Sequence, residues 1–158
     1  LKQNTLFSEA GEGLSPYSIG KHRHAPEIEQ EIGVAVGGKV KVNFTPHLIP
    51  MARGELCTSY VKLNGATADD LRQALADAYR DEPFVHVAPK GVVPQTQNVR
   101  GSNYVQIGVF PDRIPGRAIV ISTLDNLVKG SAGQAIQNMN LVLGFPETTG
   151  LEQIALFP

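Results

Sequence analysis

Several stretches of the chain carry the apolar pattern that β-strands show. Residues 39–44 alternate polar and apolar side chains, as a strand does when one face meets a core and the other meets water. Residues 56–63 are rich in β-branched and aromatic side chains, and Asn64-Gly65 ends this run with the chemistry of a turn. Residues 84–87 form a shorter apolar run. The pattern predicts a strand at each place.

Two further apolar runs, residues 104–110 and 117–122, stand close together in the sequence. The segment between them contains Pro111, Pro115 and Gly116, which are residues of turns and loops. Strands joined by so short a connection pair more readily as a hairpin than through a crossover. The spacing therefore predicts an antiparallel hairpin with a longer loop.

Two other stretches have the 3.6-residue period of helices. Thr67 is a typical helix N-cap residue, and Asp69 and Asp70 favour the positive first turn. The apolar positions that follow are Leu71, Leu75, Ala78 and Tyr79. The later stretch contains Ala132, Ala135, Ile136, Met139 and Leu143, and Gly144 and Pro146 follow it. Strands and helices in this order predict an α+β fold, with a mixed, mainly antiparallel sheet covered by helices.

Composition narrows the classes of function. A chain of 158 residues with 42% hydrophobic content is enough for one domain, residues 1–158. The net charge is -1 and the basic residues are scattered, so neither nucleic acid nor a membrane surface is an expected partner. No apolar run approaches the ~20 residues of a membrane span and the start lacks a signal-peptide layout, so we expect a cytoplasmic protein. The single cysteine, Cys57, excludes an internal disulfide, and we expect it and Tyr60 to be core residues.

The densest group of reactive side chains lies in residues 22–27, which contain His22, Arg23, His24 and Glu27. Imidazole and carboxylate groups move protons, and a guanidinium holds anions. Nothing before Lys21 offers a nucleotide-binding strand or a nucleophile, and no glycine-rich G-x-G-x-x-G turn follows a strand. The segment therefore looks like one half of an active site whose other half lies outside this chain.

Four segments, in order, resemble N-acetyl-γ-glutamyl-phosphate reductases, the arginine-biosynthesis family of the semialdehyde dehydrogenase class. They are residues 20–28 with the His-Arg-His-Ala-Pro-Glu string, 44–54, 125–135 and 144–151. The resemblance implies a fold like the C-terminal domain of glyceraldehyde-3-phosphate and semialdehyde dehydrogenases. It also implies a preceding NADP-binding domain with a cysteine nucleophile, N-acetylglutamyl phosphate as substrate, and a homo-oligomer. The chain would then be the substrate-binding and dimerisation domain, inactive without the rest.

In such an enzyme a thiolate attacks the acyl phosphate, and hydride addition to the resulting thioester creates an oxyanion that must be protonated. We expect His24 to carry this proton and Glu27 to orient it. Pro26 fits the first helical position, which would leave the His24 backbone just outside the helix and Glu27 in its first turn. His22 is the alternative acid/base group or a substrate contact. His-x-His also permits a metal site, but no cysteine pair supports one, so we expect none.

Arg53 is the expected contact for the substrate's carboxylate or phosphate, and a solvated loop arginine is its plain alternative. Lys129, Gly130 and Gln134 open the last helix and are candidate contacts near the nicotinamide. The alternative there is that the glycines of residues 129–134 allow close packing of the helix on the sheet. Two other functions remain open: a semialdehyde dehydrogenase of the aspartate type, and a non-catalytic small-molecule-binding or oligomerisation module.

Overall fold

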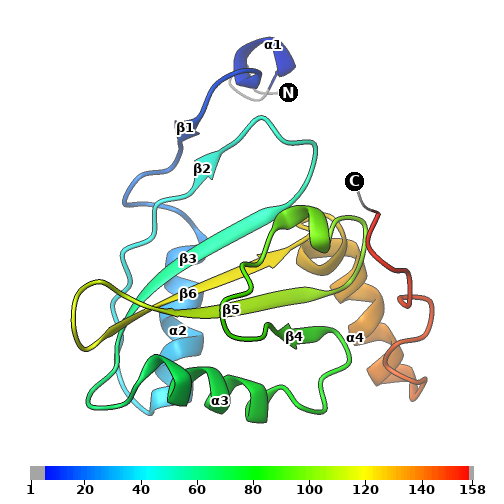
Figure 1. Cartoon of the computed structure of the whole chain (residues 1–158). Coiled ribbons are helices and arrows are strands. Elements are labelled where there is room, and N and C mark those ends of the chain that lie inside the picture. Colours follow the sequence, from blue (N-terminus) through cyan, green and yellow to red (C-terminus); the bar gives the residue numbers. More distant parts are fainter. Residues whose placement is uncertain (1–5, 157–158) are drawn as a thin grey trace. The chain divides into compact units, whose positions relative to one another are not determined.

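The chain forms two compact units, residues 1–52 and 53–158. A computed structural model describes residues 6–156. The first unit contains α1 (Phe7–Ala10), β1 (Ser15–Pro16), α2 (His24–Val36) and β2 (His47–Leu48), and β1 pairs with β2 in antiparallel fashion (Figure 1). Helix α2 ends at Gly37, whose φ of 66° suits the left-handed conformation of a helix C-cap.

The predicted strand at residues 39–44 is wrong. The segment follows α2 without a strand partner in the described part of the chain, although Val40, Val42 and Phe44 are half-buried as the alternation indicated. The segment is held to α2 by the side chain of Glu29. Glu29 Oε1 accepts from the Val42 backbone N at 3.2 Å, and Glu29 Oε2 accepts from Lys41 Nζ at 2.7 Å. The apolar period predicted which residues face inward, but a strand also needs a neighbouring strand.

The second unit is built on a four-stranded sheet in the order β3-β6-β5-β4 (Figure 1). Its strands are β3 (Glu55–Lys62), β4 (Val85–Val87), β5 (Val105–Pro111) and β6 (Arg117–Leu124). β6 is antiparallel to both β3 and β5, while β4 and β5 are parallel. The predicted hairpin is β5–β6, and the prediction of a mixed, mainly antiparallel α+β fold is confirmed.

Helix α3 (Ala68–Ala78) starts with a capping box, in which Asp70 N donates to Thr67 Oγ1 and Thr67 N donates to Asp70 Oδ2. The helix packs on β4 and β5. The core of this unit includes Phe84, Val99, Ile107, Val109 and Ala118. After β6 the chain makes a π-helical turn, Val128–Ala132, and then α4, Gly133–Leu143, which ends at Gly144 as predicted.

The edge strand β3 is poorly covered, and this overturns two expectations. Cys57 and Tyr60 are both exposed, Tyr60 with 64% of its surface open. Because α3 lies over β4 and β5, it leaves a mostly apolar groove of about 570 Å³ beside β3, lined by residues that include Val61, Leu71 and Val120. Among the described residues, no helix is long and apolar enough to cross a membrane.

Candidate functional site

The two histidines of the cluster lie side by side where α2 begins, with ring centroids 4.7 Å apart. Tyr17 and Phe44 contact the His22 ring edge-on, at centroid distances of 5.4 and 5.2 Å. His22 Nδ1 accepts a hydrogen bond from the His24 backbone N at 3.2 Å. That N–H belongs to the first helical turn and has no acceptor within the helix. His22 therefore caps the helix, and its Nδ1 is occupied.

His24 is exposed, and its imidazole contacts a cation. Arg23 Nε donates to His24 Nε2 at 3.3 Å. A guanidinium only donates hydrogen bonds, so Nε2 is the acceptor and offers a lone pair in this arrangement. Glu27 is also exposed, and no hydrogen bond among the described residues joins it to His24. The orienting role of Glu27 stays a prediction, and the side chain that hydrogen-bonds to the imidazole is that of Arg23.

The start of α2 differs from the expected position. The helix begins at His24, and Pro26 is its third residue, whereas the sequence predicted Pro26 at the first helical position. Proline costs little anywhere in the first turn because the N–H groups there lack intrahelical acceptors. The cap from His22 lets the helix start earlier, so His24 lies within the first turn. Glu27 lies in that turn as predicted.

Arg53, in the second unit, stands at the entrance to β3 and is 31% exposed. Its Nη1 lies 3.3 Å from Asp125 Oδ2, and Asp125 is fully buried at the end of β6. The backbone beside Arg53 is also fixed, since Gly54 N donates to Asn126 Oδ1 at 2.7 Å. A buried partner and a fixed backbone distinguish Arg53 from a freely solvated loop arginine, while its partial exposure leaves it open to an anion.

Asp125 connects three segments of the chain. Oδ2 accepts from Gly101 N at 2.6 Å, and Oδ1 accepts from Leu127 N at 2.8 Å and from Val128 N at 3.1 Å. Burial alone raises the pKa of the Asp125 carboxyl, but these three N–H donors and the charge of Arg53 outweigh it, so the pKa lies below its ordinary value. The buried group is therefore a carboxylate.

Asp125 and Asn126 are site residues that were not predicted from the sequence. A signal was present, because an Asp-Asn pair directly after a strand is typical of turns in which the side chain accepts from the following backbone N–H groups. That signal predicts the bonds to Leu127 and Val128. It contains nothing about Gly101 or Arg53, which are distant in sequence.

Lys129 points into its own unit. Its Nζ donates to Gln137 Oε1 at 2.8 Å and lies 5.6 Å from the centre of the Phe84 ring. Burial lowers the pKa of Lys129, although the nearby charges of Glu147 and Glu82 oppose the effect. One donor of its ammonium is thus bonded within its own unit, and the role of Lys129 as a cofactor contact stays a prediction.

Gly133 is tightly packed, whereas Gly130 and Gln134 remain partly accessible. A Cβ on Gly133 would lie 2.4 Å from Asn103 Oδ1 and 2.8 Å from the carbonyl oxygen of Val128. At this position the close-packing interpretation of the glycines is favoured. Gln134 donates to Asn138 Oδ1 along the exposed side of α4. Gly130 and Gln134 are therefore the residues of this segment that fit a contact with a bound cofactor.

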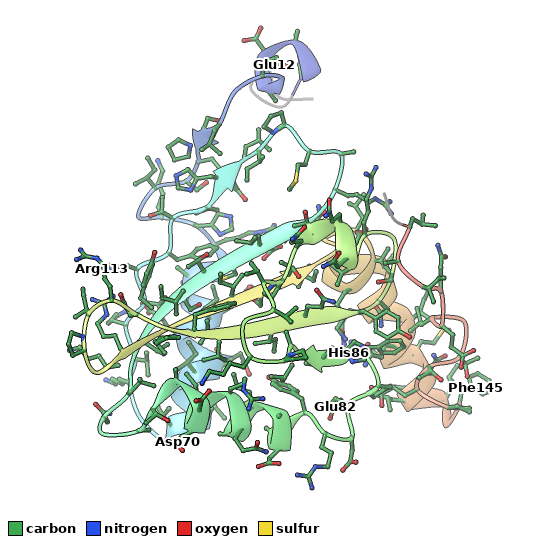
Figure 2. All side chains as sticks on the ribbon, viewed as in Figure 1. Glu12, Asp70, Glu82, His86, Arg113 and Phe145 are labelled. Carbon is green, nitrogen blue, oxygen red and sulfur yellow. The ribbon has the colours of Figure 1, made fainter. Side chains whose placement is uncertain are left out.

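The other ionisable groups do not gather into a metal site: within residues 6–156, no three side chains of the His, Cys, Asp and Glu types lie together as ligands. His86, labelled in Figure 2, belongs to β4, and its ring contacts that of Tyr104 in a tilted arrangement, with ring centroids 5.1 Å apart. The groove beside β3 is mostly apolar and offers few donors to an acyl phosphate. The candidate residues are thus the His22–Glu27 segment in one unit and the Arg53–Asp125 pair in the other.

Solved structures with this fold define the class. The chain superposes on aspartate semialdehyde dehydrogenase II from Vibrio cholerae with a TM-score of 0.69, 18% identity, and coverage of 90% of this chain and 44% of that one. The aspartate semialdehyde dehydrogenase of Francisella tularensis gives a TM-score of 0.64, 16% identity, and coverage of 83% and 39%. At such identities the likeness concerns the fold, which is that of a semialdehyde dehydrogenase domain.

The family model described as "Semialdehyde dehydrogenase, dimerisation domain" matches residues 1–126, and the chain belongs to this family. It is 57% identical over 158 residues to the probable chloroplastic N-acetyl-gamma-glutamyl-phosphate reductase of Arabidopsis thaliana, covering 99% of this chain and 39% of that protein. It is 58% identical to the N-acetyl-gamma-glutamyl-phosphate reductase of Rhodospirillum rubrum, covering 99% and 45%. The chain thus spans less than half the length of these curated relatives.

Proposed function

We propose that this chain is the substrate-binding and acid/base part of an N-acetyl-γ-glutamyl-phosphate reductase. The intact enzyme would reduce N-acetylglutamyl phosphate to N-acetylglutamate semialdehyde with NADPH, a reaction of arginine biosynthesis. The identity of 57–58% to proteins of that name supports the activity. The single observation in the structure that supports a chemical role is the exposed His24 imidazole, whose Nε2 offers a lone pair beside the Arg23 guanidinium.

His24 would serve a carbonyl carbon held as a thioester by a cysteine of the preceding domain. NADPH, held mainly by that domain, supplies a hydride when bound. Hydride addition would turn the carbonyl oxygen into an oxyanion. Nε2 of His24 would take the proton of the cysteine thiol when the thioester forms and would pass it to this oxygen, giving a thiohemiacetal. When the thiohemiacetal releases the aldehyde and the thiolate, its hydroxyl proton would return to His24. His22 is less suited to this step because its Nδ1 already caps α2.

Arg53 would hold an anionic group of the substrate. Its guanidinium presents a planar set of donors that matches carboxylate or phosphate oxygens. No hydrogen bond of the described residues uses the Nε or Nη2 donors of Arg53, while Nη1 faces Asp125. Gly130 and Gln134 would border the nicotinamide.

The test is an assay of the full-length enzyme with NADPH and either N-acetylglutamyl phosphate or aspartyl phosphate. We expect NADPH oxidation with the first substrate and much slower oxidation with the second. Faster turnover of aspartyl phosphate would favour a reductase of the aspartate type. No oxidation with either acyl phosphate, in a folded protein that binds NADPH, would reject the activity and leave a binding module.

We further propose that the second unit forms a two-fold dimer through the sheet face that bears Tyr60. Residues paired directly across neighbouring strands share a face, so Tyr60 lies with Ile119 and Phe110. Leu56 belongs to the same face of β3, and it and Tyr60 are 51% and 64% exposed. A second copy suits this apolar surface because the family itself is described as a dimerisation domain and two-fold contacts are self-complementary.

Tyr60→Lys should convert the full-length protein to monomers in sedimentation equilibrium, because an ammonium would be buried without a partner. Val93→Lys is the matched control, since Val93 is similarly exposed but lies in a loop. A Tyr60→Lys protein with the wild-type mass would rule out this face. A cytoplasmic location remains a prediction from the sequence, and the name of the Arabidopsis relative says chloroplastic.

A further inference from the structure

We propose that Asp125 is a positioning residue for substrate binding, whose buried carboxylate holds Arg53 in the orientation that receives the substrate's anionic group. The inference rests on the proposed function, because it assigns a role to Asp125 through the anion contact of Arg53. Asp125 itself would not touch the substrate.

Asp125 is built rigidly enough for this role. Three backbone N–H groups, from Gly101, Leu127 and Val128, fix both of its oxygens, and no part of its side chain is exposed. A carboxylate held in this way cannot rotate to follow a mobile arginine. The Nη1 of Arg53, 3.3 Å from Asp125 Oδ2, is therefore held in one place. This contact also limits the orientations that the plane of the guanidinium can adopt.

Such restriction matters because a long side chain loses rotamer freedom when it binds a ligand. An arginine already ordered by a buried partner has less freedom left to lose, so the same contacts give tighter binding. The backbone contributes in the same direction, since Asn126 Oδ1 accepts from Gly54 N and so fixes the chain next to Arg53. Asp125 and Asn126 together fix the side chain and the backbone at the entrance to β3.

The pairing with Asp125 also explains why the residue at position 53 would have to be arginine. A guanidinium has five N–H donors in a planar fork, so one edge can face Asp125 while another faces an anion. A lysine ammonium is a single point of charge, so an ammonium paired with Asp125 would not be available to bind the substrate's anion. If Asp125 holds the side chain at position 53, Arg53→Lys must bind substrate as poorly as Arg53→Ala.

A matched control pair lies in the same sheet. Asp112 is nearly buried, and its Oδ2 lies 3.2 Å from Nε of Arg117 at the first residue of β6. β6 runs from Arg117 to Leu124, so roughly 23 Å of strand, at about 3.3 Å per residue, separate this pair from Asp125. Figure 2 shows Arg113, beside Asp112, at the tip of the hairpin.

The experiment measures kcat and KM for N-acetylglutamyl phosphate at saturating NADPH in the full-length enzyme. The variants are Arg53→Ala, Arg53→Lys, Asp125→Asn, the double variant Arg53→Ala/Asp125→Asn, and the control Asp112→Asn. We expect Arg53→Ala, Arg53→Lys and Asp125→Asn each to raise KM about tenfold or more with kcat nearly unchanged, as the loss of a charge-assisted contact does. The double variant should match Arg53→Ala, and Asp112→Asn should keep the wild-type KM.

Each of the other possible results would overturn either the role of Asp125 or the proposed function. A folded Asp125→Asn enzyme with the wild-type KM, or a double variant whose KM rises by the product of the single effects, overturns the role of Asp125 while the proposed function stands. Thermal melting shows whether Asp125→Asn folds. If it does not, the Arg53→Lys enzyme is the test, and a KM of this variant near the wild-type value overturns the inference. A wild-type enzyme that does not reduce N-acetylglutamyl phosphate overturns the proposed function, and this inference with it.

Discussion

Gly133→Ala tests whether the glycines at the start of α4 serve packing. The new Cβ would lie 2.4 Å from Asn103 Oδ1, 2.8 Å from Val128 Cγ1 and 2.8 Å from the Val128 carbonyl oxygen. Asn103 cannot easily move away, because it is buried and its Nδ2 donates to Gln137 Oε1 at 2.9 Å. The helix must therefore shift. Overpacking of this kind lowers the free energy of unfolding by about 1–3 kcal/mol. The higher helix propensity of alanine offsets up to about 1 kcal/mol of this loss.

The net loss, about 1–2 kcal/mol, should lower the Tm in calorimetry of the full-length protein by several degrees, at roughly 2–4 °C per kcal/mol. Gly130→Ala is the control: its Cβ would meet Leu124 Cδ1, the end of a flexible side chain, at 3.3 Å, and we expect little change in Tm. Equal Tm values for wild type and Gly133→Ala would refute the packing argument. If Gly130 borders the nicotinamide, Gly130→Ala should instead raise the KM for NADPH.

The remaining predictions concern charges of the second unit. The pKa of Asp125 is lowered in the folded protein, so its contribution to stability is present above its unfolded pKa of about 3.9 and is lost as pH falls through the folded pKa. The Tm difference between wild type and Asp125→Asn should therefore shrink on acidification below about pH 4, and a constant difference would contradict this. Lys129→Met should leave the KM for NADPH unchanged, since the Lys129 ammonium is bonded to Gln137; a large rise would restore Lys129 as a cofactor contact.

Local patterns predicted the elements that depend on local interactions. The capping box of Thr67 and Asp70, the left-handed cap at Gly144 and the β5–β6 hairpin all arise among residues close in sequence. The family resemblance likewise depended on ordered motifs in the sequence, and the comparisons confirm it.

The features that the sequence could not predict depend on which segments, distant in the sequence, come into contact in the folded chain. The alternating residues 39–44 had the period of a strand but no strand to pair with. Cys57 and Tyr60 have core-like side chains, yet both are exposed. Cys57 is exposed because α3 covers β4 and β5 instead of β3, whereas Tyr60 lies on the sheet face opposite to the one that α3 covers. Asp125 reaches Gly101 and Arg53 only in the folded chain. Residue type predicted that Arg53 binds anions, but not that a buried carboxylate holds it.

The most direct test of the central claim is the kcat of His24→Asn in the full-length enzyme, compared with that of His22→Phe. Protonation of the oxyanion matters chiefly in the transition state, so His24→Asn should lower kcat by about a hundredfold or more with little change in KM. His22→Phe removes the cap on the His24 N–H but keeps an aromatic ring between Tyr17 and Phe44, and should retain most of kcat. A His24→Asn enzyme with the wild-type kcat would contradict the claim that this imidazole carries the proton.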